Sequence, residues 1–212
     1  MSRKLAIFSV VAIIGVILDQ VTKFWVRGSE AVNSAAGIEV IPHFFSIVHA
    51  ENPGAAFSMF GDLPEMWRVI LFVGFTIVAV VVVGDMYRKL PKDDRFMAAT
   101  LGLIISGAIG NVLDRLLKPL WGDKSTVTDF LRFYTDDPAW MEFLGPRFSE
   151  YPTFNVADIS LVVGVILFLI HYLFIEDRSG STDEDDVDED ELDETMDDDA
   201  VEEDVDDVAT ST

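Results

Sequence analysis

Several acidic, amide and basic residues lie at or near the ends of the long apolar segments of this sequence. Asp19 and Lys23 are four residues apart towards the end of the first segment, and Asp158 opens the last. Charged groups at such positions are costly, and they usually face the interior of a helix bundle. The set expected at one level of such a bundle is Asp19, Lys23, Asn52, Asn111, Asp114, Arg115, Asp129, Asn155 and Asp158.

The chemistry open to these residues is narrow. The chain has no cysteine nucleophile, and its three histidines belong to no recognisable serine or zinc motif. No glycine-rich phosphate loop is present either. Two close carboxylates can share one proton, because both cannot readily ionise at short distance. One then activates a water while the other protonates the substrate, which hydrolyses an amide without a metal or a covalent intermediate.

Each residue also has an ordinary structural interpretation. Oppositely charged residues four apart pair on helix surfaces, acids suit helix starts, and Asn-Pro-Gly favours a turn. These alternatives are a surface ion pair for Asp19 and Lys23, helix-end charges for Asp114 and Arg115, a turn for Asn52-Pro53-Gly54, a helix cap for Asp158 and a solvated loop acid for Asp129. Their convergence on one level of a bundle is what favours a functional site.

The charge of the chain is concentrated in its C-terminal segment. The 212 residues carry a formal net charge of -22 with a mean hydropathy of +0.31, and half of them are hydrophobic. Residues 176–212 hold 20 acidic residues and one basic residue, which leaves residues 1–175 nearly neutral and strongly apolar. This balance argues against a nucleic-acid binder. We expect the acidic tail to be disordered and open to a basic partner.

Four apolar segments must position the polar residues. Each offers about 16–22 residues, or roughly 24–33 Å of helix, which matches the hydrocarbon thickness of a bilayer. The sequence therefore predicts an all-α membrane protein with four transmembrane helices. The segments are Leu5–Leu18 with a continuation to Val26, Val69–Gly84, Phe96–Leu113 and Ile159–Ile175.

Basic residues orient these helices. They are densest at the N-terminus and in the short link Asp85–Arg95, so we expect both to be cytoplasmic. Both termini are then cytoplasmic, and the polar residues lie near the outer face. We expect the first segment to be a retained anchor, because Asp19 and Lys23 stand near the place where a cleaved signal peptide needs small residues.

The two outer loops are more than connectors. Short β segments are predicted in the first loop, at Val40–Ile41, Phe44–Val48 and Ala55–Phe60. The second loop, residues 118–153, is rich in aromatic residues that favour a membrane interface. We expect a small extracytoplasmic region that contains β structure, with both loops on the outer membrane surface.

Five ordered motifs in residues 1–175 resemble the lipoprotein signal peptidases, the type II signal peptidases of bacterial inner membranes. The stretches from Arg115 to Asp129 and from Asp129 to Asp158 look longer than in compact members of that family. The motifs are Asp19-Gln20-Val21-Thr22-Lys23, Asn52-Pro53-Gly54-Ala55-Ala56-Phe57, Gly107-Ala108-Ile109-Gly110-Asn111-Val112-Leu113-Asp114-Arg115, Val127-Thr128-Asp129-Phe130 and Phe154-Asn155-Val156-Ala157-Asp158.

This resemblance implies an intramembrane aspartic endopeptidase with Asp129 and Asp158 as the catalytic pair and no cofactor. It implies structural or substrate-orienting roles for Asp19 and Lys23. The substrate would be a prolipoprotein, presented from membrane lipid and cut before a cysteine that carries diacylglycerol. The supporting residues that the resemblance implies are Asn52, Gly54, Asn111, Asp114, Arg115, Asn155 and Ala157.

Two other classes of protein compete with this interpretation. A small membrane transporter subunit would use the polar groups as an ion path, but such a path needs ionisable groups at several depths. A non-catalytic membrane scaffold would use its acidic tail to recruit basic partners. Release of a signal peptide from a lipid-modified prolipoprotein separates both classes from the peptidase.

Chelators are expected to leave cleavage unchanged, because no cluster of His, Cys or carboxylate residues in the sequence has a recognisable metal spacing. The measurement is the cleavage rate before and after EDTA. A rate that falls in EDTA and returns with added zinc would contradict a metal-free mechanism.

Overall fold

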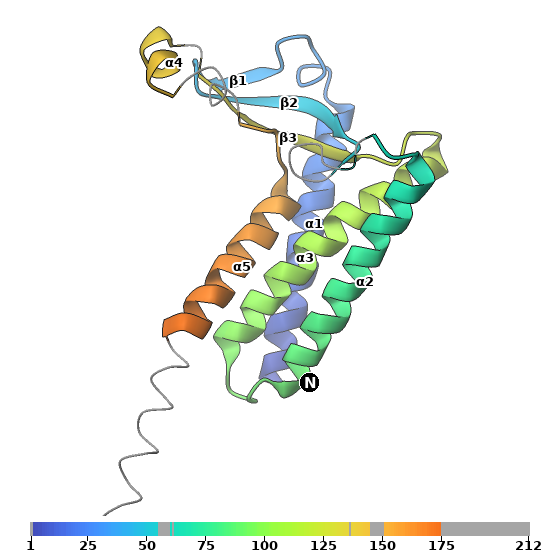
Figure 1. The fold of residues 1–212 in the computed structure, drawn as a ribbon, viewed down its shortest axis with the longest axis vertical. Helices are drawn as coiled ribbons and strands as arrows, with labels where there is room; N and C mark the ends of the chain where they lie inside the picture. The colour runs from blue at the N-terminus through green and yellow to red at the C-terminus, as the bar shows by residue number, and fades with distance from the viewer. Residues whose placement is uncertain (1, 55–59, 61, 136, 145–150, 175–212) are drawn as a thin grey trace, which may run out of the picture. The chain divides into compact units, whose positions relative to one another are not determined.

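The computed structural model describes residues 2–54, 60, 62–135, 137–144 and 151–174 (Figure 1). Within these residues, four helices are long and apolar enough to cross a membrane, as the sequence predicts. The first three helices extend beyond the predicted apolar segments at both ends, and the fourth begins at Val156, before its predicted start at Ile159. The helices are α1 (Arg3–Gly28), α2 (Glu65–Lys89), α3 (Arg95–Leu117) and α5 (Val156–Phe174), with the 3-10 helix η2 (Lys118–Trp121) directly after α3 and a short helix α4 (Pro138–Leu144).

Local polar contacts begin and end these helices. The Ser2 hydroxyl accepts a hydrogen bond from the Leu5 N–H at the start of α1, and Asp94 caps α3 through the Met97 N–H. The buried Lys4 ammonium donates to the carbonyl oxygens of Tyr87 and Leu90 at 2.9 and 2.7 Å. Lys4 therefore satisfies backbone oxygens at the C-terminal end of α2 that have no partner within that helix.

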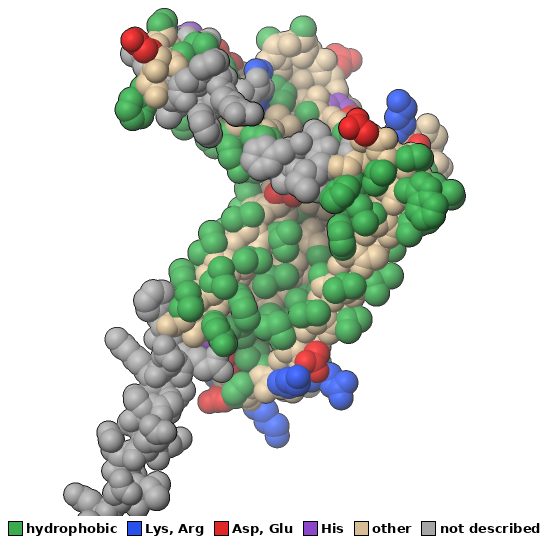
Figure 2. All heavy atoms as spheres, in the orientation of Figure 1, with side chains coloured by type: hydrophobic (Ala, Val, Ile, Leu, Met, Phe, Trp, Pro, Cys, Tyr) green, Lys and Arg blue, Asp and Glu red, His purple; other side chains and the backbone are tan. Residues whose placement is uncertain are grey.

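Helix α3 is the central helix. Half of the most apolar stretch of α3 is buried, whereas the buried share of the corresponding stretch is 11% in α1 and α2 and 17% in α5. A cluster of Met97, Leu101 and Ile105 from α3 with Val83 from α2 forms the apolar core between the helices. The outer surfaces of the helices expose large apolar side chains, as Figure 2 shows, which is the surface that contact with lipid requires.

Glycines let α3 approach its neighbours closely. A Cβ atom added to Gly102 would lie 2.9 Å from the Phe8 carbonyl oxygen of α1. A Cβ atom at Gly107 would lie against the Ala157 carbonyl oxygen and 2.8 Å from Leu161 Cβ in α5. Small residues at such crossings are typical of helices that pack within membranes.

A three-stranded antiparallel sheet lies beyond one end of the helices (Figure 1). Its strands β1 (Ile38–Ile41), β2 (Phe45–Asn52) and β3 (Val127–Phe133) pair in that order. Ala50 pairs with Asp129, and Asn52 pairs with Val127. Val26, Val32 and Phe130 form a second buried cluster, which attaches the sheet to the end of α1.

The predictions for the two loops are confirmed in part. Strands β1 and β2 contain the predicted segments Val40–Ile41 and most of Phe44–Val48, although β2 continues to Asn52. The predicted segment Ala55–Phe60 lies outside the described residues except for Phe60, which is in a turn. Strand β3 and helix α4 lie in a region that the sequence presents only as an aromatic-rich loop. Strand β3 starts with four consecutive buried residues, so it lacks the alternation that reveals a half-buried strand.

Substitution of Gly107 by Ala is expected to destabilise the bundle, because the added methyl group would force α3 and α5 apart. Overpacking of this kind costs about 1–3 kcal/mol. Gly74→Ala is the matched control, because a Cβ atom there meets nothing within 4 Å in another helix. Thermal unfolding in detergent micelles measures both, and equal midpoints for the two variants would contradict the close approach of α3 to α5.

Candidate active site

Two carboxylates from different elements meet one network of amides. Asp129 lies on β3, and Asp158 lies in the first turn of α5. Asp129 accepts hydrogen bonds from the side-chain amides of Asn52 at 2.9 Å and Asn155 at 2.7 Å. Asp158 accepts from the Asn111 side-chain amide at 2.7 Å and from the Asn155 backbone N–H at 3.0 Å. Each of the four carboxylate oxygens therefore receives one N–H.

Hydrogen bonds at the start of α5 fix the position of the Asp158 carboxylate. Asn155 stands directly before the helix, and its side-chain oxygen accepts from the Asp158 N–H at 3.0 Å. Asp158 returns a bond by accepting from the Asn155 N–H, so the two residues form a reciprocal capping box. The interpretation of Asp158 as a helix cap is thus correct, and the same contacts also aim its carboxylate at the network.

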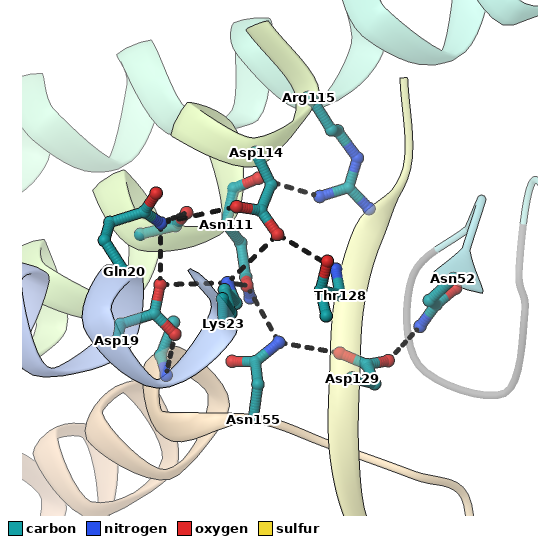
Figure 3. Close-up of polar contacts among 12 residues, drawn as sticks. Asp19, Gln20, Lys23, Asn52, Asn111, Asp114, Arg115, Thr128, Asp129 and Asn155 are labelled. Atoms are coloured by element: carbon teal, nitrogen blue, oxygen red, sulfur yellow. Dashed lines mark hydrogen bonds and ion pairs between the residues drawn. The ribbon is translucent and has the colours of Figure 1, made fainter. Parts of the chain in front are cut away.

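The Asn52-Pro53-Gly54 segment likewise forms the predicted turn and also contributes to the candidate site. The Gly54 N–H donates to the Asn52 side-chain oxygen at 2.9 Å, which closes a side-chain turn. Because that oxygen is occupied, the Asn52 amide nitrogen points towards Asp129 (Figure 3). The turn therefore orients a donor to the carboxylate on β3.

A buried ion cluster lies next to this network. The Lys23 ammonium lies 2.9 Å from Asp19 and 3.6 Å from Asp114, and the Lys23 and Asp19 side chains are fully buried. The interpretation of Asp19 and Lys23 as a surface pair is therefore wrong. Asp19 accepts from the Ala157 N–H at 2.9 Å, and Asp114 accepts from the Thr128 N–H at 2.9 Å. The cluster thus ties α1 and α3 to α5 and β3.

Arg115 connects α3 with the Asn52–Gly54 turn. Its guanidinium donates to the Gly54 carbonyl oxygen at 2.5 Å and to the Asn111 carbonyl oxygen at 3.3 Å. It also lies over the Phe72 ring of α2, 4.0 Å from the ring centroid. Arg115 is 5% exposed, so its positive charge is buried within a site that holds several carboxylates.

Asp129 differs from an ordinary surface acid. Burial, followed by repulsion from Asp158, raises the pKa of Asp129 to about 6, although hydrogen bonds from Asn52 and Asn155 oppose the shift. The side chain is 1% exposed, so the interpretation of Asp129 as a solvated loop acid is wrong. A carboxyl group with this pKa can hold a proton close to neutral pH.

A second polar cluster lies at the edge of the site and was not predicted. The buried Lys118 ammonium donates to Glu51 at 2.5 Å, and the Thr126 hydroxyl donates to the same oxygen of Glu51. Burial favours the neutral form of Glu51, but the bonds from Lys118 and Thr126 outweigh it and lower the pKa of Glu51. Glu51, Lys118 and Thr126 belong to none of the five motifs, and the position of Lys118 directly after α3 was the available signal.

The two carboxylates open into a cavity with a volume of about 1260 Å³. Its polar lining includes Asn52, Arg115, Asp129 and Asp158. Its apolar lining includes Phe72 and Phe75 of α2 together with Leu161 and Val162 of α5. Among the described residues, no group of three or more His, Cys, Asp and Glu side chains is arranged to hold a metal ion.

All eleven site residues that the sequence predicts therefore meet in this region. The contacts place Gly54 and Arg115 against each other, Ala157 at Asp19, and the remaining eight within the amide network or the ion cluster. The structure adds the Thr128 backbone N–H and the Gln20 side chain, which donates to Asp19 at 3.0 Å. Gln20 belongs to the first of the five motifs and Thr128 to the fourth.

Fold and site together define a multi-pass membrane protein with a buried carboxylate site. A family model described as Signal peptidase (SPase) II matches residues 11–174. The chain belongs to the signal peptidase II family and is a peptidase, as its motifs predict.

The relatives support this assignment over nearly their full length. The chain is 33% identical over 170 residues to the lipoprotein signal peptidase of Maridesulfovibrio salexigens, covering 80% of this chain and 97% of that protein. It is 37% identical over 174 residues to the lipoprotein signal peptidase of Symbiobacterium thermophilum, covering 81% and 97%. A solved bacterial membrane enzyme is 30% identical, with a TM-score of 0.59 over 82% of this chain and 92% of that one.

Substitution of Asn52 by Leu is expected to raise the pKa of Asp129 further above about 6. The Asn52 amide donates to the ionised carboxylate, and its loss removes an interaction that favours the charged form. Infrared titration of the protonated carboxyl band measures the change. An unchanged or lowered pKa would show that Asn52 does not stabilise the charge on Asp129.

Proposed function

We propose that this protein removes signal peptides from diacylglyceryl-modified prolipoproteins, cutting directly before the lipidated cysteine, with Asp129 and Asp158 as an aspartic catalytic pair. The observation that carries the proposal is the convergence of the two carboxylates on Asn155, whose amide nitrogen contacts Asp129 and whose backbone N–H contacts Asp158. Two carboxylates in one amide network can exchange a proton through a water between them.

The environments of the two carboxylates support different starting roles. Asp129 is buried on a strand, and its raised pKa favours the protonated form. Asp158 lies in the first turn of α5, where it accepts hydrogen bonds from the Asn111 amide and the Asn155 N–H. Asp129 is therefore assigned as the acid and Asp158 as the base.

The reaction then needs no other group. Asp158 takes a proton from water as the water oxygen attacks the scissile carbonyl carbon, and Asp129 gives its proton to the carbonyl oxygen. When the tetrahedral intermediate collapses, the carbon–nitrogen bond breaks and Asp158 gives its proton to the departing amine. Asp129 recovers its proton from the hydroxyl group of the intermediate, so both carboxylates return to their starting states.

The cavity fits a substrate that is partly lipid. Its lining combines the two carboxylates with apolar side chains of α2 and α5, helices whose outer surfaces are apolar. An acyl chain or an apolar signal segment can lie against these apolar side chains while the peptide bond reaches the carboxylates. The names of the relatives, lipoprotein signal peptidases, support this substrate class.

The proposed location is the bacterial inner membrane, with the site near the outer face and both termini in the cytoplasm. The density of basic residues at the N-terminus and in the α2–α3 link supports this orientation. In it, residues 176–212 form a cytoplasmic tail attached to a peptidase domain of residues 1–175. The tail lies outside the described residues.

Asp129→Asn and Asp158→Asn are each expected to lower the cleavage rate by roughly 10²–10⁴-fold, because asparagine cannot take part in acid–base catalysis. The assay follows release of the signal peptide from a synthetic diacylglyceryl prolipoprotein in detergent micelles. Asp85→Asn is the control, because Asp85 is exposed and pairs with Lys89 four residues further along α2.

Thermal unfolding checks that each variant folds. Near-normal turnover in either folded variant would remove that residue from the catalytic pair. An intact wild-type protein that releases no signal peptide would contradict the proposed function itself.

A further inference from the structure

Lys23 is the shared partner of three side chains that lie next to the proposed catalytic pair. Its ammonium contacts Asp19 at 2.9 Å, Asp114 at 3.6 Å and the Asn111 side-chain oxygen at 2.9 Å (Figure 3). The Lys23 side chain has no exposed surface. A buried ammonium must find partners for its N–H groups, so these three contacts hold it in one place.

The two acids beside Lys23 occupy equivalent positions with respect to the catalytic pair. Asp19 accepts from the backbone N–H of Ala157, the residue directly before Asp158. Asp114 accepts from the backbone N–H of Thr128, the residue directly before Asp129. One cation therefore lies between two carboxylates, and each carboxylate holds the backbone one residue before a member of the pair.

The contact with Asn111 has a chemical consequence. An ammonium group can only donate hydrogen bonds, so the Asn111 atom that faces Lys23 must be the oxygen. The amide nitrogen must then face the opposite way, where it donates to Asp158 at 2.7 Å. If the amide were reversed, its oxygen would face the Asp158 carboxylate, and the contact would be favourable only after Asp158 gained a proton.

The second amide of the network is oriented in a similar way. The Asp158 backbone N–H donates to the Asn155 side-chain oxygen, which turns the Asn155 amide nitrogen towards Asp129 and the Asn111 oxygen. The contact that orients the Asn155 amide therefore lies within the first turn of α5. For Asn111, the donors to its side-chain oxygen are Lys23 and Asn155, and Lys23 is the charged one.

We infer that Lys23 is a positioning residue that fixes the Asn111 amide with its nitrogen on Asp158, and so holds a hydrogen-bond donor against the base. The inference rests on the proposed function and deepens it. It distinguishes Lys23 from a cation that only balances buried charge, because charge balance alone would not decide which end of the Asn111 amide faces Asp158.

The decisive comparison uses two double variants with the same net charge. Both carry Asp19→Asn, so that one negative charge is removed together with the positive charge of Lys23. The asparagine oxygen at position 19 can still accept the hydrogen bond from the Ala157 N–H. Lys23→Met/Asp19→Asn has no donor for the Asn111 oxygen at position 23, whereas Lys23→Gln/Asp19→Asn retains an uncharged N–H donor. We expect kcat of the Gln variant to exceed that of the Met variant by about tenfold or more, the effect of one hydrogen bond in a charged network.

The pH profile gives a readout that a merely structural role would not move. In the Met variant, we expect kcat to fall with little change in KM, and the acidic limb of the kcat profile to move to higher pH. The charged groups that face this region are Asp19 and Arg27 from α1, Asp114 and Arg115 from α3, Asp129 from β3 and Asp158 from α5.

Lys4→Met is the matched control, because Lys4 is a second buried lysine of α1 whose contacts are with the carbonyl oxygens of Tyr87 and Leu90. It should lower the unfolding temperature and leave kcat and the pH profile unchanged. Equal kcat values for the Met and Gln double variants, or wild-type kcat in the Met variant, would overturn the inference. Absence of cleavage by the wild-type protein would instead contradict the proposed function.

Discussion

The buried ion cluster of Lys23, Asp19 and Asp114 is the constraint on which the site depends. Taking charges out of water costs several kcal/mol per ion, and the cost is recovered only when every donor and acceptor is satisfied. The cluster meets this condition by using backbone N–H groups of α5 and β3 as well as side chains. The energetic need to satisfy buried charge is therefore the same force that holds the elements bearing Asp158 and Asp129 together.

Close helix packing makes this cluster possible. Gly110 of α3 leaves room for the Asp19 carboxylate, since a Cβ atom there would lie 2.6 Å from an Asp19 oxygen. Gly107 gives α5 the same access to α3. Without side chains at these crossings, the polar groups of three helices come within hydrogen-bond distance. Packing and electrostatics are therefore linked in this bundle, because a wider spacing would leave buried charges without partners.

Several residues serve structure and proposed function through the same contacts. Asn155 and Asp158 cap α5 reciprocally, and Asn52 closes a turn with Gly54. In each case the atom used for the local structure is one end of an amide or carboxylate, which leaves the other end aimed at the network. This explains why the structural and functional interpretations of these residues do not exclude one another.

The sequence predicts the helical membrane architecture, the first two strands and the polar residues that meet at the candidate site. Long apolar segments have few alternatives in length and environment, and five ordered motifs identified the family. The buried state of Asp19 and Lys23 was not decided, because an i, i+4 pair looks the same on a helix surface and in a bundle interior. Strand β3 was missed for a related reason, since its consecutive buried residues conceal its period.

Which atom of each residue meets which partner depends on the tertiary structure. The Ala157 N–H reaches Asp19 across 138 residues of sequence, and Lys23 reaches Asn111 across 88. The pairing of Glu51 with Lys118 likewise spans 67 residues. A sequence pattern reports the period and the ends of its own element, whereas these bonds depend on distances between elements. Those distances are set by packing at the glycine crossings and by the need to pair buried charge.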